Sequence, residues 1–192
     1  MNKKLIAVAV AGVLAAPVVM ADNSVTIYGV ADVGLEQVEA KGAAAGAASD
    51  VASKSRVTSN SSYIGFKGQE ELGGSLKAIW QIEQAIDIDD GGGASANGFA
   101  TRDSFVGLSS AQAGTVVMGR LTTPTRAVAS KLDVFPGQAG IGADTAILGN
   151  TGAANKQGSL AFDTRKQNAL GIVTPTIAGM NVSMAYIANE GR

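Results

Sequence analysis

Three aspartates stand beside a run of glycines, and carboxylates at this spacing could coordinate calcium. Asp87, Asp89 and Asp90 precede Gly91–Gly93. An EF-hand loop that started at Asp87 would need an oxygen ligand at position 91 and a glutamate at position 98. This chain has Gly91 and Gly98 there. The glycine run also lacks the Gly-Lys-Ser/Thr ending of a phosphate-binding loop. We therefore interpret the stretch as a solvated acidic loop, with no more than a weak cation contact.

The composition argues against catalysis and against nucleic-acid binding. The 192 residues include no cysteine and no histidine, and the formal net charge is −1. A disulfide, a thiolate metal site, a Ser-His-Asp triad and most zinc sites are thereby excluded. Lysine and arginine do not cluster with aromatic residues, as they do on nucleic-acid-binding surfaces. We expect a protein that is not an enzyme, uses no cofactor and binds no nucleic acid.

The second half of the stretch 62–89 follows the period of a β-strand, with exceptions only at Ile79, Gln84 and Ala85. Even positions carry Leu76, Ala78, Trp80, Ile82, Ile86 and Ile88, and odd positions carry Lys77, Gln81, Glu83, Asp87 and Asp89. A period of two places these sets on opposite faces of a strand. Gly73-Gly74 separates Tyr63–Gln69 from Ser75–Ile88 and predicts a hairpin. The second segment exceeds the usual strand of roughly 5–6 residues and suits a membrane-crossing strand of roughly 9–11. One apolar and one charged face are typical of a barrel with lipid outside and water inside.

Alternating segments recur along the chain and predict about seven antiparallel strands. The others are Ser24–Glu36, Phe99–Leu108, Thr115–Leu121, Asn168–Thr174 and Asn181–Asn189. The last two form a hairpin whose turn is placed at Ala178-Gly179. The alternation is weaker in Phe99–Leu108, where the neighbours Arg102 and Asp103 must point to opposite faces. One of these two charges is expected at a rim or at a subunit contact.

Two segments show little periodicity and are predicted as loops. Residues 39–60 are rich in Ala, Gly and Ser, and we expect a surface loop there. Residues 121–166 contain Pro124, Pro136 and several glycines. A loop of this length is usually functional or disordered. In a barrel it could fold into the lumen and narrow it.

The N-terminus predicts export from the cytoplasm. Lys3-Lys4 precede the apolar run Leu5–Ala16, and short residues surround a cleavage point after Ala21. The apolar run is shorter than the roughly 20 residues of a spanning helix. We expect residues 1–21 to be a signal peptide and residues 22–192 to be the mature chain.

Several of these stretches resemble one family, the general diffusion porins of Gram-negative bacteria, of the trimeric beta-proteobacterial type to which the neisserial porins belong. The similar stretches are SVTIYGVADVGLE, SRVTSNSSYIGFKGQEELGGSLKAIWQIE, NGFATRDSFVGLSS, GTVVMGRLTTP and, more loosely, QNALGIVTPTIAGMNVSMAY. Each is unspecific alone, and their order along nearly the whole mature chain carries the resemblance.

The resemblance implies an all-β transmembrane antiparallel barrel of 16 strands with a pore-constricting third loop. It also implies a homotrimer in outer-membrane lipid, inserted by the outer-membrane assembly machinery. Seven strands and an end without the family's terminal aromatic residue predict the N-terminal part of such a barrel. A complete smaller barrel is the alternative.

The resemblance also suggests which charges would line a constriction. Basic residues of the family's barrel wall face acidic residues of the inward loop. The wall candidates are Lys67, Lys77, Arg102 and Arg120, and the loop candidates are Arg126, Lys131, Asp133, Asp144 and Arg165. A solvated surface position is the alternative for each of them. Gly171 and Val173 stand where family members commonly carry inward charges, so a less charged constriction is expected.

The leading hypothesis is passive diffusion of ions and small hydrophilic solutes across the outer membrane. The preference for anions or cations stays open. A plugged surface barrel that binds a partner through its loops is the second hypothesis, and a soluble secreted β-protein is the third.

Overall fold

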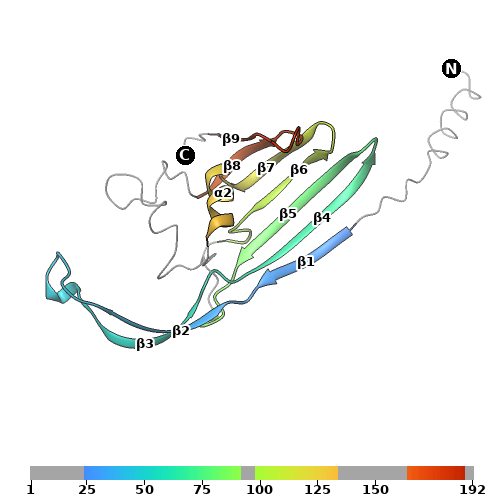
Figure 1. Ribbon diagram of the computed structural model, residues 1–192. Coiled ribbons are helices and arrows are strands. Elements are labelled where there is room, and N and C mark those ends of the chain that lie inside the picture. Colours follow the sequence, from blue (N-terminus) through green and yellow to red (C-terminus); the bar gives the residue numbers. More distant parts are fainter. Residues whose placement is uncertain (1–23, 92–97, 134–163, 189–192) are drawn as a thin grey trace, which may run out of the picture.

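The computed structural model describes residues 24–91, 98–133 and 164–188, and its main element is one antiparallel sheet. Seven strands lie side by side in the order β1-β4-β5-β6-β7-β8-β9 (Figure 1). Their bounds are Ser24–Val30 for β1, Tyr63–Gly73 for β4, Leu76–Ala85 for β5, Ser104–Ser110 for β6, Gly114–Thr122 for β7, Arg165–Val173 for β8 and Ser183–Ile187 for β9. The number of strands predicted for the main sheet, seven, and the edge positions of the first and the last are confirmed. The predicted signal peptide lies outside the described residues.

Glycine-rich turns close the predicted hairpins. Gly74 and Ser75, between β4 and β5, have φ angles of 58° and 66°. Gly73, the last residue of β4, has a φ of 90°, which glycine adopts without the steric cost of a side chain. Ala178 and Gly179, between β8 and β9, have φ angles of 51° and 81°. Positive φ at both central residues suits the twist of a tight hairpin. The Ala178-Gly179 turn lies where the sequence predicted it, and the first turn lies one residue after the predicted Gly73-Gly74.

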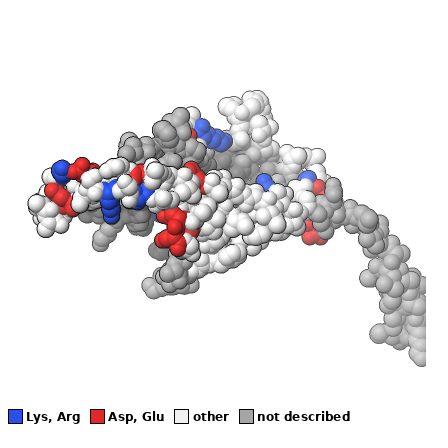
Figure 2. All heavy atoms as spheres, turned by 90° about the horizontal axis from the view of Figure 1, so that it is seen from below, with Lys and Arg blue, Asp and Glu red and all other residues white. Residues whose placement is uncertain are grey.

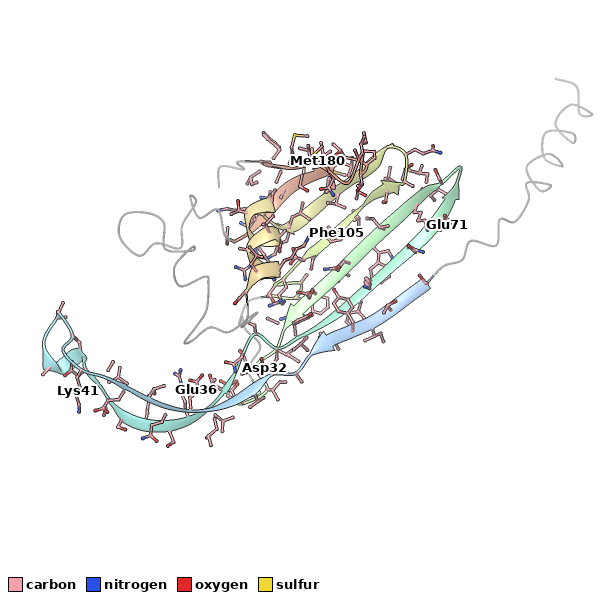
Figure 3. The ribbon with its side chains drawn as sticks, in the orientation of Figure 1. Asp32, Glu36, Lys41, Glu71, Phe105 and Met180 are labelled. Atoms are coloured by element: carbon pink, nitrogen blue, oxygen red, sulfur yellow. The ribbon has the colours of Figure 1, made fainter. Side chains whose placement is uncertain are left out.

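The first predicted strand is in fact two strands, and the predicted loop 39–60 is wrong. The chain leaves the sheet after Val30, and β2 (Val33–Ala40) pairs with β3 (Val51–Ser59) in a separate two-stranded sheet. A short 3-10 helix, η1 (Ala47–Ser49), precedes β3. The β2–β3 hairpin extends away from the main sheet (Figures 1 and 3). Both faces of β3 carry small or polar residues, so the strand has no apolar period that could reveal it.

Two polar residues hold the junction between the sheets. Ser62 is fully buried, and its hydroxyl donates to the carbonyl of Asp32 at 3.0 Å and accepts from the Asp32 amide at 2.9 Å. The amide of Asn60 also donates to the Asp32 carbonyl at 2.9 Å. These bonds satisfy the backbone at the point where it departs from the ladder.

One face of the main sheet is apolar and exposed. A row of directly opposed residues crosses all seven strands: Val25, Gly68, Trp80, Val106, Met118, Leu170 and Tyr186. Val25 and Tyr186 are each 67% exposed. The body of the sheet carries few charged side chains in Figure 2, where charges gather toward the end with the β2–β3 hairpin. Leu121 and Ala169 are the buried apolar residues of the described part, so the apolar side chains do not form an interior core. The predicted apolar face is confirmed.

The long segment after β7 begins with a helix that the sequence analysis did not predict. Helix α2 spans Pro124–Leu132, and its N-cap Thr123 accepts a hydrogen bond from the Arg126 amide at 3.4 Å. Proline suits the first helical position because the amide there has no helical partner. Residues 134–163 lie outside the described part. Within the described residues, no helix is long and apolar enough to cross a bilayer.

Candidate functional site

The opposite face of the sheet divides into a polar half and an apolar half. On β1, β4 and β5 it carries Thr26, Tyr28, Lys67, Gln69, Gln81 and Glu83, and from β6 onward it carries Phe105, Gly107, Val117, Ala169, Gly171 and Ala185. Helix α2 lies over the second half. Both faces of β6 are therefore apolar, which explains why apolar and polar residues alternate less clearly in its sequence.

A carboxylate holds together a cluster in the polar half. Glu83 on β5 is 6% exposed, accepts a hydrogen bond from the Tyr28 hydroxyl at 3.1 Å and forms an ion pair with Arg102. The Arg102 guanidinium lies 4.3 Å from the ring centroid of Tyr63. Glycine at position 65 leaves room for the Tyr28 ring, since a Cβ there would lie 2.7 Å from the hydroxyl oxygen. The charge of Arg102 is therefore neutralised by Glu83. The alternation of side chains along the sequence did not identify this partner.

Lys67 faces the same side, and its ammonium lies over an aromatic ring. Its ammonium lies 5.2 Å from the ring centroid of Tyr28, which is within the range of a cation–π interaction. It lines a shallow pocket with Thr26, Gln69 and Gln81. Within the described residues Lys67 forms no ion pair.

Lys77 shares this face but lies at the far end of the sheet. Its ammonium pairs with Glu71 at 2.5 Å beside the β4–β5 turn, and Figure 3 shows Glu71 there. Lys77 and Glu83 are six positions apart on β5, a separation of roughly 20 Å at about 3.3 Å per residue. The structure thus does not bring Lys77 together with Arg102.

Arg120 and Arg165 lie near the ends of the long segment. The Arg120 guanidinium donates to the carbonyl of Thr101 at 2.8 Å. Arg165 forms an ion pair with Asp103 at 2.7 Å. The same carboxylate accepts from the amide and the hydroxyl of Thr122. Asp103 therefore faces the inner side, a position that the sequence analysis left undecided.

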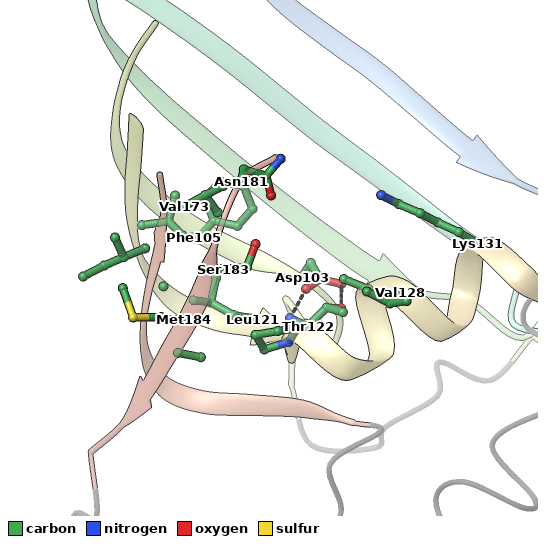
Figure 4. Close-up of a pocket in the computed structure, with 16 residues that line it drawn as sticks. Asp103, Phe105, Leu121, Thr122, Val128, Lys131, Val173, Asn181, Ser183 and Met184 are labelled. Carbon is green, nitrogen blue, oxygen red and sulfur yellow. Dashed lines mark hydrogen bonds between the residues drawn. The ribbon is translucent and has the colours of Figure 1, made fainter. Parts of the chain in front are cut away.

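Helix α2 and the inner face enclose a cavity of about 500 Å³ (Figure 4). Phe105, Val117 and Leu121 line it from the sheet, and Val128 and Lys131 line it from the helix. Gly171 and Val173 also belong to the lining, and a Cβ on Gly171 would lie 2.9 Å from Leu121 Cδ1.

The remaining loop candidates surround this helix. Arg126 lies in its first turn, Lys131 in its last turn and Asp133 at its C-cap. Asp144 lies outside the described residues. Among the described residues, no three His, Cys, Asp or Glu side chains are grouped so that they could hold a metal ion. The roles of all these charges at a constriction stay predictions.

Comparisons with known proteins agree on one family. The model of the Gram-negative porin family matches residues 7–192. Major outer membrane protein P.IB of Neisseria gonorrhoeae is 31% identical over 190 residues, which cover 99% of this chain and 49% of that protein. Outer membrane porin protein 32 of Delftia acidovorans is 35% identical over 191 residues, with 99% and 50% coverage. The solved anion-selective porin from Comamonas acidovorans superposes with a TM-score of 0.70 at 29% identity, covering 88% of this chain and 48% of that one. The chain spans about half the length of these relatives.

Proposed function

The chain belongs to the Gram-negative porin family, and from that premise we propose that the full-length protein forms a water-filled channel for ions and small hydrophilic solutes. The observation that carries the proposal is the sheet itself, which exposes an apolar row on one face and places charges and helix α2 on the other. The relatives are named outer membrane proteins, and the same membrane is proposed for this one.

The two faces of the main sheet suit two different environments, lipid on the apolar side and water on the charged side. Exposed apolar area costs about 25 cal/mol per Å² in water, so lipid is the medium that suits the row from Val25 to Tyr186. The opposite face carries the hydrated charges, and α2 narrows the space beside it. Transport through such a path is passive and requires no catalytic group.

Closure of the barrel is part of the proposal. In the described sheet, β1 and β9 each pair on one side, and an open edge invites pairing with another strand. We propose that further strands of the full-length protein complete a 16-stranded barrel and that three copies assemble with the help of the outer-membrane machinery. The relatives' greater length supports the further strands.

The pairing of charges favours a weak preference for anions. Arg102 and Arg165 are matched by Glu83 and Asp103, whereas Lys67 and Arg120 form no ion pair in the described part of the chain. Charges that line a pore set its selectivity. Arg120 stands opposite Ser104, on the face of Met118, so the inner-face cation of this pair is Lys67. An unmatched lysine on the inner face would attract anions, and the solved relative is described as anion-selective.

Planar bilayers that contain the full-length protein test the channel. Stable conductance steps are expected, and their absence would leave a plugged surface barrel as the better description. Lys67→Gln should move the reversal potential under a salt gradient toward cations. Lys77→Gln removes the same charge at a position four residues farther along β5 than the partner of Lys67, roughly 13 Å from Lys67 along the strand. This separation exceeds a Debye length of about 8 Å, so the reversal potential should move much less. Equal shifts for Lys67→Gln and Lys77→Gln would contradict the assignment of Lys67.

A further inference from the structure

The two ends of the long segment are joined by one carboxylate. Asp103, just before β6, accepts hydrogen bonds from the Thr122 amide at 2.5 Å and from the Thr122 hydroxyl at 2.8 Å. The oxygen that accepts from the Thr122 hydroxyl, Oδ2, also accepts from Arg165 Nε at 2.7 Å. Thr122 ends β7 and Arg165 begins β8. Asp103 thus connects the end of β7, where the segment begins, to the start of β8, where the segment ends.

A second set of bonds continues from this point into helix α2. The Thr123 amide and hydroxyl both donate to the Thr164 carbonyl at 3.0 Å, and the Thr164 amide donates back to the Thr123 hydroxyl at 3.4 Å. That hydroxyl also caps α2 through the Arg126 amide. The position of the first helical turn therefore follows the position of the tied ends.

Packing does little to hold α2 in place. No residue of the helix is buried among the described residues, and Val128 and Leu132 are 61% and 81% exposed. A cavity of about 500 Å³ separates the helix from the sheet (Figure 4). The β7–β8 ladder also shifts register between Gly119 and Leu121, directly before the segment. The hydrogen-bonded base is the firmest attachment that the described residues provide.

We propose that Asp103 is the positioning residue of the solute path: it closes the base of the segment 123–164 and thereby holds α2 over the inner face of the wall. Loss of the carboxylate lets the helix move and lets the open width of the path fluctuate. The consequence for transport rests on the proposed channel, since only a channel has a width for the helix to set.

A spin label on α2 tests the anchor without any measurement of transport. The chain contains no cysteine, so Ser130→Cys on the exposed side of the helix provides a labelling site in the full-length protein. Asp103→Asn keeps the side-chain size and removes the charge that pairs with Arg165. A hydrogen bond to a charged group is strong enough that its loss should raise the mobile fraction of the spectrum about tenfold. Glu71→Gln removes a similar ion pair at the far end of the sheet and should leave the spectrum unchanged. An Asp103→Asn spectrum equal to that of the parent would overturn the proposal.

A reversible cross-link tests the effect on transport. Thr122 and Arg165 lie directly opposite each other in the ladder, where a disulfide can replace the carboxylate as the tie. In the variant Asp103→Ala/Thr122→Cys/Arg165→Cys, oxidation should give quiet single-channel currents, and reduction should raise their fluctuation to the level of Asp103→Asn. Equal fluctuation in both redox states would count against the anchor. Absence of any current from the unsubstituted protein would instead refute the proposed channel, and the spin-label result would then decide on Asp103 alone.

Discussion

Replacement of Glu83 by glutamine is the sharpest test of the cluster on the polar half of the inner face. Glutamine preserves the size of the side chain and removes its charge. The Arg102 guanidinium, with a side chain 17% exposed, would then lose its ion-pair partner, and the Tyr28 hydroxyl would lose a charged acceptor. Both losses occur at one position, so a single substitution reports on the whole cluster.

The expected cost follows from the burial of the pair. A hydrogen bond to a charged group contributes about 1.5–3 kcal/mol, and removal of one partner from a fully buried ion pair costs roughly 3–5 kcal/mol. Glu83 and Arg102 have side chains 8% and 17% exposed, so the lower range applies, and we expect Glu83→Gln to lower the free energy of unfolding by about 2 kcal/mol. Arg102→Met should cost a similar amount. The double variant should cost less than the sum by at least about 1 kcal/mol, because no charge is left unpaired.

Urea unfolding of the full-length protein in lipid vesicles, followed by circular dichroism, measures these costs. Glu71→Gln is the matched control, since it breaks a more exposed pair and should cost under about 1 kcal/mol. Single-variant costs that add within error would refute the coupling of Glu83 to Arg102. Ion selectivity provides a second, independent test of the pair. Glu83→Gln leaves Arg102 without its ion-pair partner and should shift the reversal potential toward anions. Arg102→Met should shift the reversal potential toward cations.

Three further predictions use the same unfolding assay or hydrogen exchange. Gly68→Val should cost about 1–3 kcal/mol because a Cβ at this position would lie 2.6 Å from Trp80 ring atoms, and a cost near zero would contradict that packing. Met118→Lys on the apolar face should cost about 2–4 kcal/mol, whereas Gln81→Lys on the inner face should change stability by under about 0.5 kcal/mol; equal costs would contradict the assignment of faces. Thr123→Ala should cost about 1 kcal/mol and speed amide exchange in the first turn of α2, and unchanged exchange would contradict the cap.

The strands that cross the main sheet were predictable because their side chains alternate between two different solvents. A period of two is visible wherever one face is apolar and the other is charged, as in β5. It fades in β6 because the inner face there holds Gly107 and Phe105, which lines the cavity beside α2. It is absent from β3, which carries small or polar residues on both faces and forms only through its pairing with β2.

Two of the wall candidates were predictable as residues of the inner side, but the partners of the candidate charges were not. Lys67 and Lys77 share that face, as alternation requires, and yet Lys77 lies at the turn end beside Glu71. Arg102 and Asp103 are neighbours, and yet both side chains lie on the inner side, because the chain bends before β6 begins. Arg102 pairs there with Glu83, and Asp103 pairs with Arg165. These partners are separated by 19 and 62 positions in the chain.

By itself, the sequence determined the class of fold, the order of the hairpins and the existence of an apolar and a charged face, because these depend on local alternation and on turn residues. Only the tertiary structure decided which charges neutralise each other, where the first strand leaves the sheet and what ties the base of the long segment. Those features depend on strand register and on side chains brought together from distant positions, and a pattern with a period of two carries no information about either. The neighbouring charges of Arg102 and Asp103 are the clearest example, since each acquires its role from a residue on another strand.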